Sequence, residues 1–173
     1  MTERGRASGL GTGEILEQPL SWLVRDATVE DLPATVGAMA QLLSELGGAV
    51  PADEALEAAT AAVIEDPECG CVLVADTVEN GLVGMLAGSW QHAIHVPGEY
   101  CILQDLWVHP AWRGRSVGAS LIAGLAERMK SRRIARVEVG LPSEHFAGLQ
   151  ATLAFYERNG FEVLGPRMRR VLA

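Results

Sequence analysis

The chain has 173 residues, 49% of them hydrophobic, and a formal net charge of −8 at pH 7. This length corresponds to one ordinary domain with a core of useful size, which argues against extensive disorder. The acidic balance argues against nucleic acid as a main partner, and no apolar run reaches the roughly 18–20 residues needed to cross a bilayer. We therefore expect neither a nucleic acid partner nor a membrane partner.

The N-terminal residues 1–20 are polar and glycine-rich and lack the apolar stretch of a secretory signal. We predict a flexible tail over residues 1–20, a single domain over residues 21–173 and a cytoplasmic location. Three cysteines at no framework spacing are typical of a reducing compartment. Cys69 and Cys71 are two positions apart, so we expect both on one face of a strand, as buried thiols.

The first half of the chain predicts a strand, two helices and a hairpin. Thr28-x-x-Asp31 resembles a capping box and opens the first helix, which has apolar residues at three- and four-residue steps. The Asn80-Gly81 pair between two apolar runs is a strong hairpin signal. The predicted elements cover residues 22–25, 28–46, 52–65, 71–75 and 82–90.

The second half alternates strands with amphipathic helices. The predicted elements are a loop over 92–98, a strand over 100–108, a helix over 117–129, a strand over 134–141, a helix over 147–159 and closing strands over 161–164 and 168–172. This order implies an α/β domain with a mixed sheet. The unit from Val108 to Ile134 implies a right-handed parallel crossover in that sheet.

The stretch 108–119 carries the clearest chemical signal. A buried strand ends there, Pro110 breaks it, and a Gly-containing turn leads directly into a strongly amphipathic helix. Amides at a helix start are unpaired and partly positive, and small residues would let a phosphate approach them. The small and the charged residues of the stretch are Gly114, Ser116, Gly118, Arg113 and Arg115. The pattern indicates a pyrophosphate cradle, and an ordinary strand–helix connection is the alternative.

Charge is divided unevenly along the chain. Residues 1–108 contain 17 acidic and 3 basic side chains, whereas residues 109–173 contain 5 acidic and 11 basic ones. This asymmetry indicates that the C-terminal part binds an anion and that the N-terminal part faces something neutral or cationic. Solvated faces that balance one another would give the same pattern.

Two motifs resemble those of the GNAT superfamily of N-acetyltransferases. Arg113-x-x-Ser116-x-Gly118 is similar to the signature Arg/Gln-x-x-Gly-x-Gly/Ala, and residues 105–110 are similar to the family's fourth strand and its exit. Residues 153–161 (LAFYERNGF) resemble its second common motif. The resemblance covers about residues 22–172 and implies the GNAT fold. That fold is a mixed, mostly antiparallel central sheet flanked by helices, with a splay between strands 4 and 5.

The resemblance also implies acetyl-CoA as co-substrate, no metal, and direct attack of a primary amine in a ternary complex. Strand main-chain groups would hold the pantetheine arm and the acetyl carbonyl, and amides of the turn and helix start would hold the pyrophosphate. The implied cofactor-binding residues are Leu106, Trp107, Val108, Arg113, Gly114, Arg115, Ser116, Val117, Gly118 and Ala119.

Two catalytic residues are expected. In the family a tyrosine at the position of Tyr156 often protonates the departing thiolate, and a phenol with a pKa near 10 can do so. Plain packing is the alternative for this side chain. The acceptor ammonium must lose a proton, for which we favour Asp105 over Glu99, although either carboxylate could be structural. Gln104 stands where some relatives have Glu.

Two positions depart from the family pattern. Ser116 replaces the first glycine of the signature, which is tolerable if the backbone there does not require a positive φ. Leu149 stands where many members carry an asparagine that contacts the cofactor, so that contact is lost or supplied by another residue.

The acceptor is left open by the sequence. The acidic first part favours a cationic amine: a polyamine, an aminoglycoside-like molecule, an amino acid derivative or a peptide lysine. His92 and His95 lack a third metal ligand, and their loop either lines the acceptor site or is simply exposed. A homodimer is common among relatives. The alternatives from other functional classes are a non-catalytic acyl-CoA-binding sensor and a different phosphate-binding module.

Overall fold

The computed structural model describes residues 21–165, 168 and 170. The predicted tail 1–20 and most of the predicted strand 168–172 lie outside these residues. The helices and strands are β1 (Leu23–Asp26), α1 (Leu32–Glu45), α2 (Asp53–Glu65), β2 (Gly70–Thr77), β3 (Gly81–Ala93), β4 (Val96–Val108), α3 (Val117–Ser131), β5 (Val137–Val139) and α4 (Leu149–Arg158), with short 3₁₀ turns at Val29–Asp31 and Pro110–Trp112.

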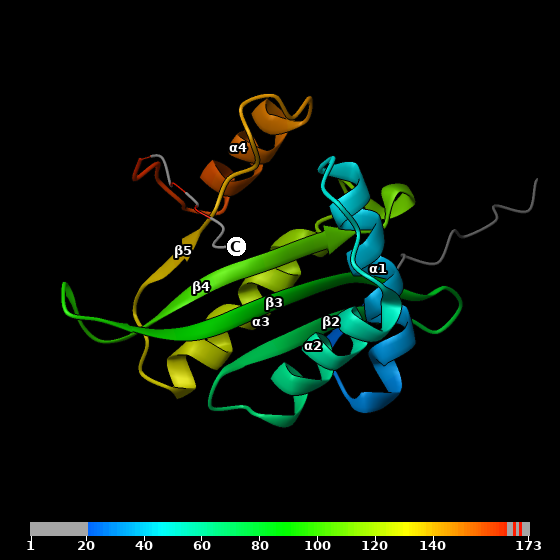
Figure 1. Ribbon diagram of the computed structural model, residues 1–173, viewed down its shortest axis with the longest axis horizontal. Coiled ribbons are helices and arrows are strands. Elements are labelled where there is room, and N and C mark those ends of the chain that lie inside the picture. The colour runs from blue at the N-terminus through cyan, green and yellow to red at the C-terminus, as the bar shows by residue number, and fades with distance from the viewer. Residues whose placement is uncertain (1–20, 166–167, 169, 171–173) are drawn as a thin grey trace, which may run out of the picture.

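The described residues form one five-stranded sheet in the order β1-β2-β3-β4-β5. The first four strands are antiparallel to their neighbours, and β5 is parallel to β4. Helices α1 and α2 cover one face of the sheet and α3 covers the other, while α4 stands beyond β5 (Figure 1). The predicted mixed, mostly antiparallel α/β fold is therefore confirmed. No described helix has the length and apolar character needed to cross a bilayer.

Helix α3 supplies the main core of the molecule. Its apolar stripe, predicted from the spacing, is buried against β1 to β4. Gly84 on β3 permits this close approach, because a Cβ there would lie only 2.9 Å from Val117 Cγ1. Each fully buried Leu or Val contributes roughly 1.5–3 kcal/mol relative to exposure. The stripe consists of Val117, Leu121, Leu125 and Met129.

Strand β4 contains a bulge that determines where its side chains point. Leu103 pairs with Gly88 and Asp105 with Ala87, so Gln104 is an extra residue on β4. A bulge reverses the alternation of faces and bends its strand. Leu103 therefore packs on the α3 side, whereas Trp107 packs on the α1 side, in a second cluster of apolar residues.

The same bulge precedes the divergence of β4 and β5. The two strands pair only along Cys101–Leu103 and Val137–Val139. In the described part of the chain, β4 continues to Val108 beyond the end of β5, which leaves residues 104–108 as an open edge. This is the splay between strands 4 and 5 that the family resemblance implies.

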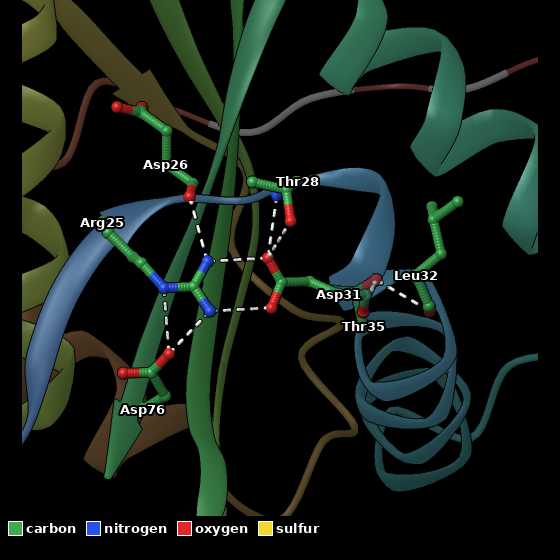
Figure 2. A network of polar contacts seen from close by, with 7 residues as sticks. All are labelled: Arg25, Asp26, Thr28, Asp31, Leu32, Thr35 and Asp76. Carbon is green, nitrogen blue, oxygen red and sulfur yellow. Dashed lines mark hydrogen bonds and ion pairs between the residues drawn. The ribbon is translucent and has the colours of Figure 1, made fainter. Parts of the chain in front are cut away.

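A network of ion pairs attaches α1 to the other edge of the sheet (Figure 2). The Arg25 guanidinium on β1 donates to both carboxylate oxygens of Asp31 at 2.7 and 2.8 Å and to Asp76 on β2 at 2.7 Å. The Thr28 N–H donates to Asp31 Oδ2 at 2.8 Å, which is one half of the predicted capping box. The hydrogen bond from Arg25 is the main reason why the pKa of Asp31 falls to about 2.

Three predicted elements differ from the structure at their ends. The prediction of a loop over residues 92–98 is wrong, because β3 and β4 remain paired up to a two-residue turn at Ile94-His95. The strand expected over 134–141 is shorter, because the Ile134 N–H donates to Met129 O and so closes α3. The strand expected over 161–164 is wrong: these residues are irregular.

The cysteines are also only partly as expected. Cys69 lies in the turn before β2 and is exposed, whereas Cys71 is on the strand and Cys101 on β4 is buried. The prediction that Cys69 and Cys71 share one strand face is therefore wrong. Burial raises the pKa of Cys71 to about 11 and that of Cys101 to about 12, so both remain thiols at neutral pH.

Candidate active-site cleft

A cleft of about 700 Å³ lies where β4 and β5 diverge. Its walls are the open edge of β4, the turn and first residues of α3, the chain after β5, helix α4 and the last turn of α1. Most of the predicted site residues meet there, although they come from three separate elements. Those that line the cleft are Asp105, Leu106, Trp107, Val108, Arg113, Gly114, Ser116, Val117, Gly118, Ala119 and Tyr156.

The open edge of β4 presents main-chain groups to the cleft. The His109 N–H donates to Val83 O on β3 at 2.9 Å. Since neighbouring residues of an extended strand point their main-chain groups in opposite directions, those of Val108 and Leu106 point away from β3. The Val108 carbonyl accepts a bond of 2.9 Å from Arg113 Nε, so the N–H of the same residue is the group left facing the cleft.

The start of α3 presents backbone donors beside this edge. The first hydrogen bond of the helix runs from the Ser120 N–H to Ser116 O at 2.9 Å. The N–H groups of residues 117–119 precede that bond and have no partner within the helix. Together with the helix dipole they form a partly positive site that suits an anionic group.

Ser116, at the helix start, has a left-handed backbone with φ of +68°. The condition under which we expected serine to be tolerable, that no positive φ is needed, is therefore not met. A non-glycine residue in this conformation costs roughly 1–2 kcal/mol, and such strain is often found at functional sites. The helix start thus keeps the conformation that glycine favours while carrying a hydroxyl.

Gly118 is small for a different reason from the one the sequence indicated. The residue is buried, and a Cβ there would lie 3.0 Å from Cζ and 3.2 Å from Cε2 of Phe155. Its missing side chain therefore allows α4 to pack against the start of α3.

The two arginines of the signature stretch have different environments. Arg113 lines the cleft, and its guanidinium donates to both carboxylate oxygens of Glu45 at 2.7 and 2.8 Å. Arg115 lies over the Trp112 ring, 5.5 Å from its centroid, and is not part of the cleft wall. Its role as a phosphate ligand stays a prediction.

Tyr156 and Asp105 lie in the same cleft, and the charge of Asp105 affects the pKa of Tyr156. Tyr156 is buried and packs against the rings of Phe155 and Phe161, each with a centroid separation of 5.2 Å. Burial, and then the negative charge of Asp105, raise the pKa of Tyr156 to about 12. Burial also raises the pKa of Asp105 above its usual value. At neutral pH the phenol is therefore protonated and available as a donor.

The second candidate base is placed elsewhere. Glu99 accepts from Arg132 at 3.2 Å near the other end of β4 and does not line the cleft. Leu149 is also outside the cleft wall, whereas Asn159 lines it, with its amide bonded to Phe155 O at 2.8 Å. No group of three or more His, Cys, Asp or Glu side chains in the described residues is arranged to bind a metal.

Sequence reasoning missed Glu45 and Arg158, two charged residues of the cleft. Arg158 stands inside the second motif, so its place in that motif was a usable signal. Glu45 is the last residue of α1, 68 positions before the arginine that it contacts. No local pattern connects the two.

Comparison with known proteins agrees with this architecture. Residues 37–161 match the family described as "Acetyltransferase (GNAT) family". No curated protein matches the chain at a significant level.

Several solved structures share the fold. An integron cassette protein from the mobile metagenome of Cole Harbour Salt Marsh is 25% identical over 87% of this chain and 89% of its own, with a TM-score of 0.70. A transcriptional regulator from Bacillus halodurans is 22% identical over 88% and 100%, with a TM-score of 0.74. AAC(6')-Iy in complex with the bisubstrate analog CoA-S-monomethyl-acetylneamine is 15% identical over 89% and 99%, with a TM-score of 0.74.

Proposed function

The chain belongs to the acetyltransferase (GNAT) family, and on that premise we propose that it transfers an acetyl group from acetyl-CoA to a primary amine. The observation that carries this proposal is the cleft itself. One cavity contains an open strand edge, the unpaired amides of a helix start and a buried protonated phenol. These are the three kinds of group that thioester binding, phosphate binding and leaving-group protonation require.

The cleft fits acetyl-CoA in both size and chemistry. A volume of about 700 Å³ is within the range of pockets that hold small-molecule ligands. Residues 114 and 116–119 would bind the pyrophosphate through the amides at the start of α3, and Arg113 would add a positive charge. The main chain of residues 106–108 would bind the pantetheine arm. The same fold in AAC(6')-Iy binds a bisubstrate analog that contains CoA, which supports this placement.

Each cleft residue can be given a chemical task. Bound acetyl-CoA supplies an activated acyl carbonyl and a thiolate leaving group. The Val108 N–H is available to stabilise negative charge on the acyl oxygen. Asp105, with its raised pKa, would accept a proton from the acceptor ammonium, directly or through water. Tyr156 holds its proton at neutral pH and would donate it to the thiolate.

The acceptor is proposed to be a small cationic amine or a peptide amine. The acidic first part of the chain contributes α1, whose single acidic residue, Glu45, lines the cleft. Aminoglycoside acetyltransferases have the same fold, including one from an uncultured soil metagenomic sample whose structure contains sisomicin. That fold similarity, at 18% identity, supports the class of acceptor and does not select one compound.

An acceptor screen tests the proposed function. Purified protein would be incubated with acetyl-CoA and a panel of amines: polyamines, sisomicin, lysine peptides, and neutral and anionic amino acids. Acetylated product should be detected by mass spectrometry, because the exposed Cys69 would react with reagents that detect free CoA. We expect turnover on cationic amines. Turnover only on neutral or anionic amino acids would contradict the charge argument.

The alternative is a non-catalytic acyl-CoA-binding sensor. The observation that favours it is the shared fold of the transcriptional regulator from Bacillus halodurans. Fold alone does not determine function, so the two proposals must be separated by activity. A sensor would bind acetyl-CoA yet acetylate no amine of the panel, whereas the enzyme would do both.

A further inference from the structure

The ion pair between Glu45 and Arg113 joins two layers of the molecule across the cleft. Glu45 is the last residue of α1, which packs on one face of the sheet. Arg113 precedes α3, which packs on the other face. Both side chains line the cleft, and the guanidinium is also held by Val108 O at 2.9 Å. Glu45 thus contacts the side chain that is best placed to meet an anionic ligand.

The carboxylates of the cleft are few. Among the described residues of its wall, the acidic ones are Glu45 and Asp105 and the basic ones are Arg113 and Arg158. Asp105 is on β4, and burial raises its pKa above the usual value, which disfavours its charged form. Glu45 keeps 36% of its side chain exposed, so it can reach a ligand in solution. This exposed carboxylate of the cleft wall is therefore available to bind a cationic group.

The ion pair between Glu45 and Arg113 is weak enough for another anion to replace Glu45. Arg113 is 48% exposed, and such surface pairs change an equilibrium constant by at most about fivefold. A pyrophosphate carries more negative charge than one carboxylate and would also bind the amides at the start of α3. When the pyrophosphate binds the Arg113 guanidinium, it replaces Glu45 as its partner. The Glu45 carboxylate is then able to bind another cation.

We propose that this ion pair couples the two substrate sites. In the protein without CoA, the Glu45 carboxylate is paired with the Arg113 guanidinium. Binding of the CoA phosphates to Arg113 releases Glu45, which then holds a charged, non-reacting amino group of the acceptor. The acceptor class is accordingly an amine with a second positive charge, such as a diamine or an aminoglycoside. This inference rests on the proposed function, since it assigns residues to CoA and to the acceptor.

The coupling makes two measurable demands. Glu45→Gln removes a competitor for the guanidinium, so CoA should bind about two- to fivefold more tightly than to the wild-type protein. The same variant loses the carboxylate for the second ammonium, so doubly charged acceptors should lose their advantage over singly charged ones. A residue that merely stabilised α1 would weaken CoA binding or leave it unchanged, and would affect all acceptors alike.

The experiment uses calorimetric titration with CoA and steady-state turnover with 1,4-diaminobutane and 1-aminobutane. The control is Glu127→Gln, which removes an exposed carboxylate on α3 that pairs with Lys130 away from the cleft. A double variant, Glu45→Gln with Arg113→Gln, checks the mechanism. The gain in CoA affinity should vanish in the Arg113→Gln background. Without the guanidinium, the Glu45 carboxylate no longer competes with the CoA phosphates for a binding partner.

The expected result is tighter CoA binding and a drop of about two- to fivefold in the diamine-to-monoamine ratio of kcat/KM for Glu45→Gln alone. Unchanged or weaker CoA binding, a gain that persists without Arg113, or an unchanged ratio would each overturn the coupling. Failure of the proposed function has a different signature: the wild-type protein itself would not bind CoA, or would bind it and acetylate neither amine.

Discussion

Tyr156 is held by its neighbours in the wall of the cleft, where we propose that it donates a proton. Its ring lies between Phe155 and Phe161, and this apolar surrounding keeps the phenol protonated well above neutral pH. The side chain could be predicted from the sequence, because it stands in a motif that spans only nine residues. The electrical influence of Asp105 could not, because it depends on how β4 and α4 come together.

Substitution of Tyr156 by Phe should lower kcat by roughly 10²-fold or more, since positioned acid–base groups contribute about 10²–10⁴. The affinity for acetyl-CoA should stay nearly the same, because the ring and its packing are kept. Steady-state kinetics with the best acceptor of the screen, together with calorimetry, would measure both quantities. Tyr100→Phe, outside the cleft, is the matched control. Equal kcat values in the two variants would rule out the proposed proton donor.

The strain at Ser116 gives a second prediction, this time about stability. Ser116→Gly should raise the free energy of unfolding by about 1 kcal/mol, because glycine adopts a φ of +68° without steric cost. The reverse change nearby, Gly114→Ala at a φ of +74°, should destabilise the protein. Denaturant unfolding would measure both. Loss of stability in Ser116→Gly would show that the hydroxyl makes a contact worth more than the strain.

At the scale of elements, the sequence predicted α1, α2, α3 and α4 to within a few residues. For α1 and α3 the signal was amphipathic spacing, because each of these helices buries one face against a neighbour. Strand ends were less predictable. Pro97 and Gly98 indicated a loop, yet the pairing of β3 with β4 continues past them to a two-residue turn. The bulge at Gln104 was also invisible in the sequence, because it exists only as a mismatch between two strands.

The Arg25 network makes α1 sensitive to acid. The pKa of Asp31 is about 2 in the folded protein against 3.8 for an unperturbed carboxyl. A lowered pKa means that its contribution to stability is present above pH 4 and is lost as the pH falls from about 4 to about 2. After allowance for solvent screening, that contribution is on the order of 1–2 kcal/mol.

The corresponding variant is Asp31→Asn. It should be less stable than the wild-type protein at pH 6, and this difference should shrink towards pH 2.5, as measured by urea unfolding at both values. Glu57→Gln, an exposed change on α2, should leave the wild-type pH profile unaltered. A constant difference between Asp31→Asn and wild type at all pH values would contradict the assigned ion pair.

At the scale of the whole molecule, the two parts of the chain that differ in net charge lie in different layers. Besides β1 to β4, the acidic first part supplies α1 and α2 on one face of the sheet, with Glu45 the single acidic residue of α1, and the later part supplies α3 on the other face and α4 beyond the edge (Figure 1). The cleft opens where these parts meet. The anion site and the cation site that we propose from this composition would therefore be neighbours. A homodimer and a cytoplasmic location stay predictions, because the structure of one chain bears on neither.

The contact between Glu45 and Arg113 shows why the sequence was insufficient at this scale. The two residues belong to different layers and approach each other only because α1 and β4 end at the same side of the molecule. Local motifs could indicate the proposed anion site, because it consists of consecutive residues. They could not predict which carboxylate faces it.

The most direct test of the account is a calorimetric titration of the protein with acetyl-CoA, with ATP and NADH for comparison. The critical variant is Ala119→Glu, which places a negative charge at the cleft end of α3. Its control is Ala123→Glu, on an exposed position one turn further along. A glutamate suits the first turn of a helix, so Ala119→Glu should remain folded.

We predict micromolar binding of acetyl-CoA to the wild-type protein and to Ala123→Glu, at least tenfold weaker binding to Ala119→Glu, and no comparable binding of ATP or NADH. If Ala119→Glu bound acetyl-CoA as well as the control does, the start of α3 would not be the phosphate site. If the wild-type protein bound another nucleotide and not acetyl-CoA, the family would describe its fold alone and the proposed acetyl transfer would be wrong.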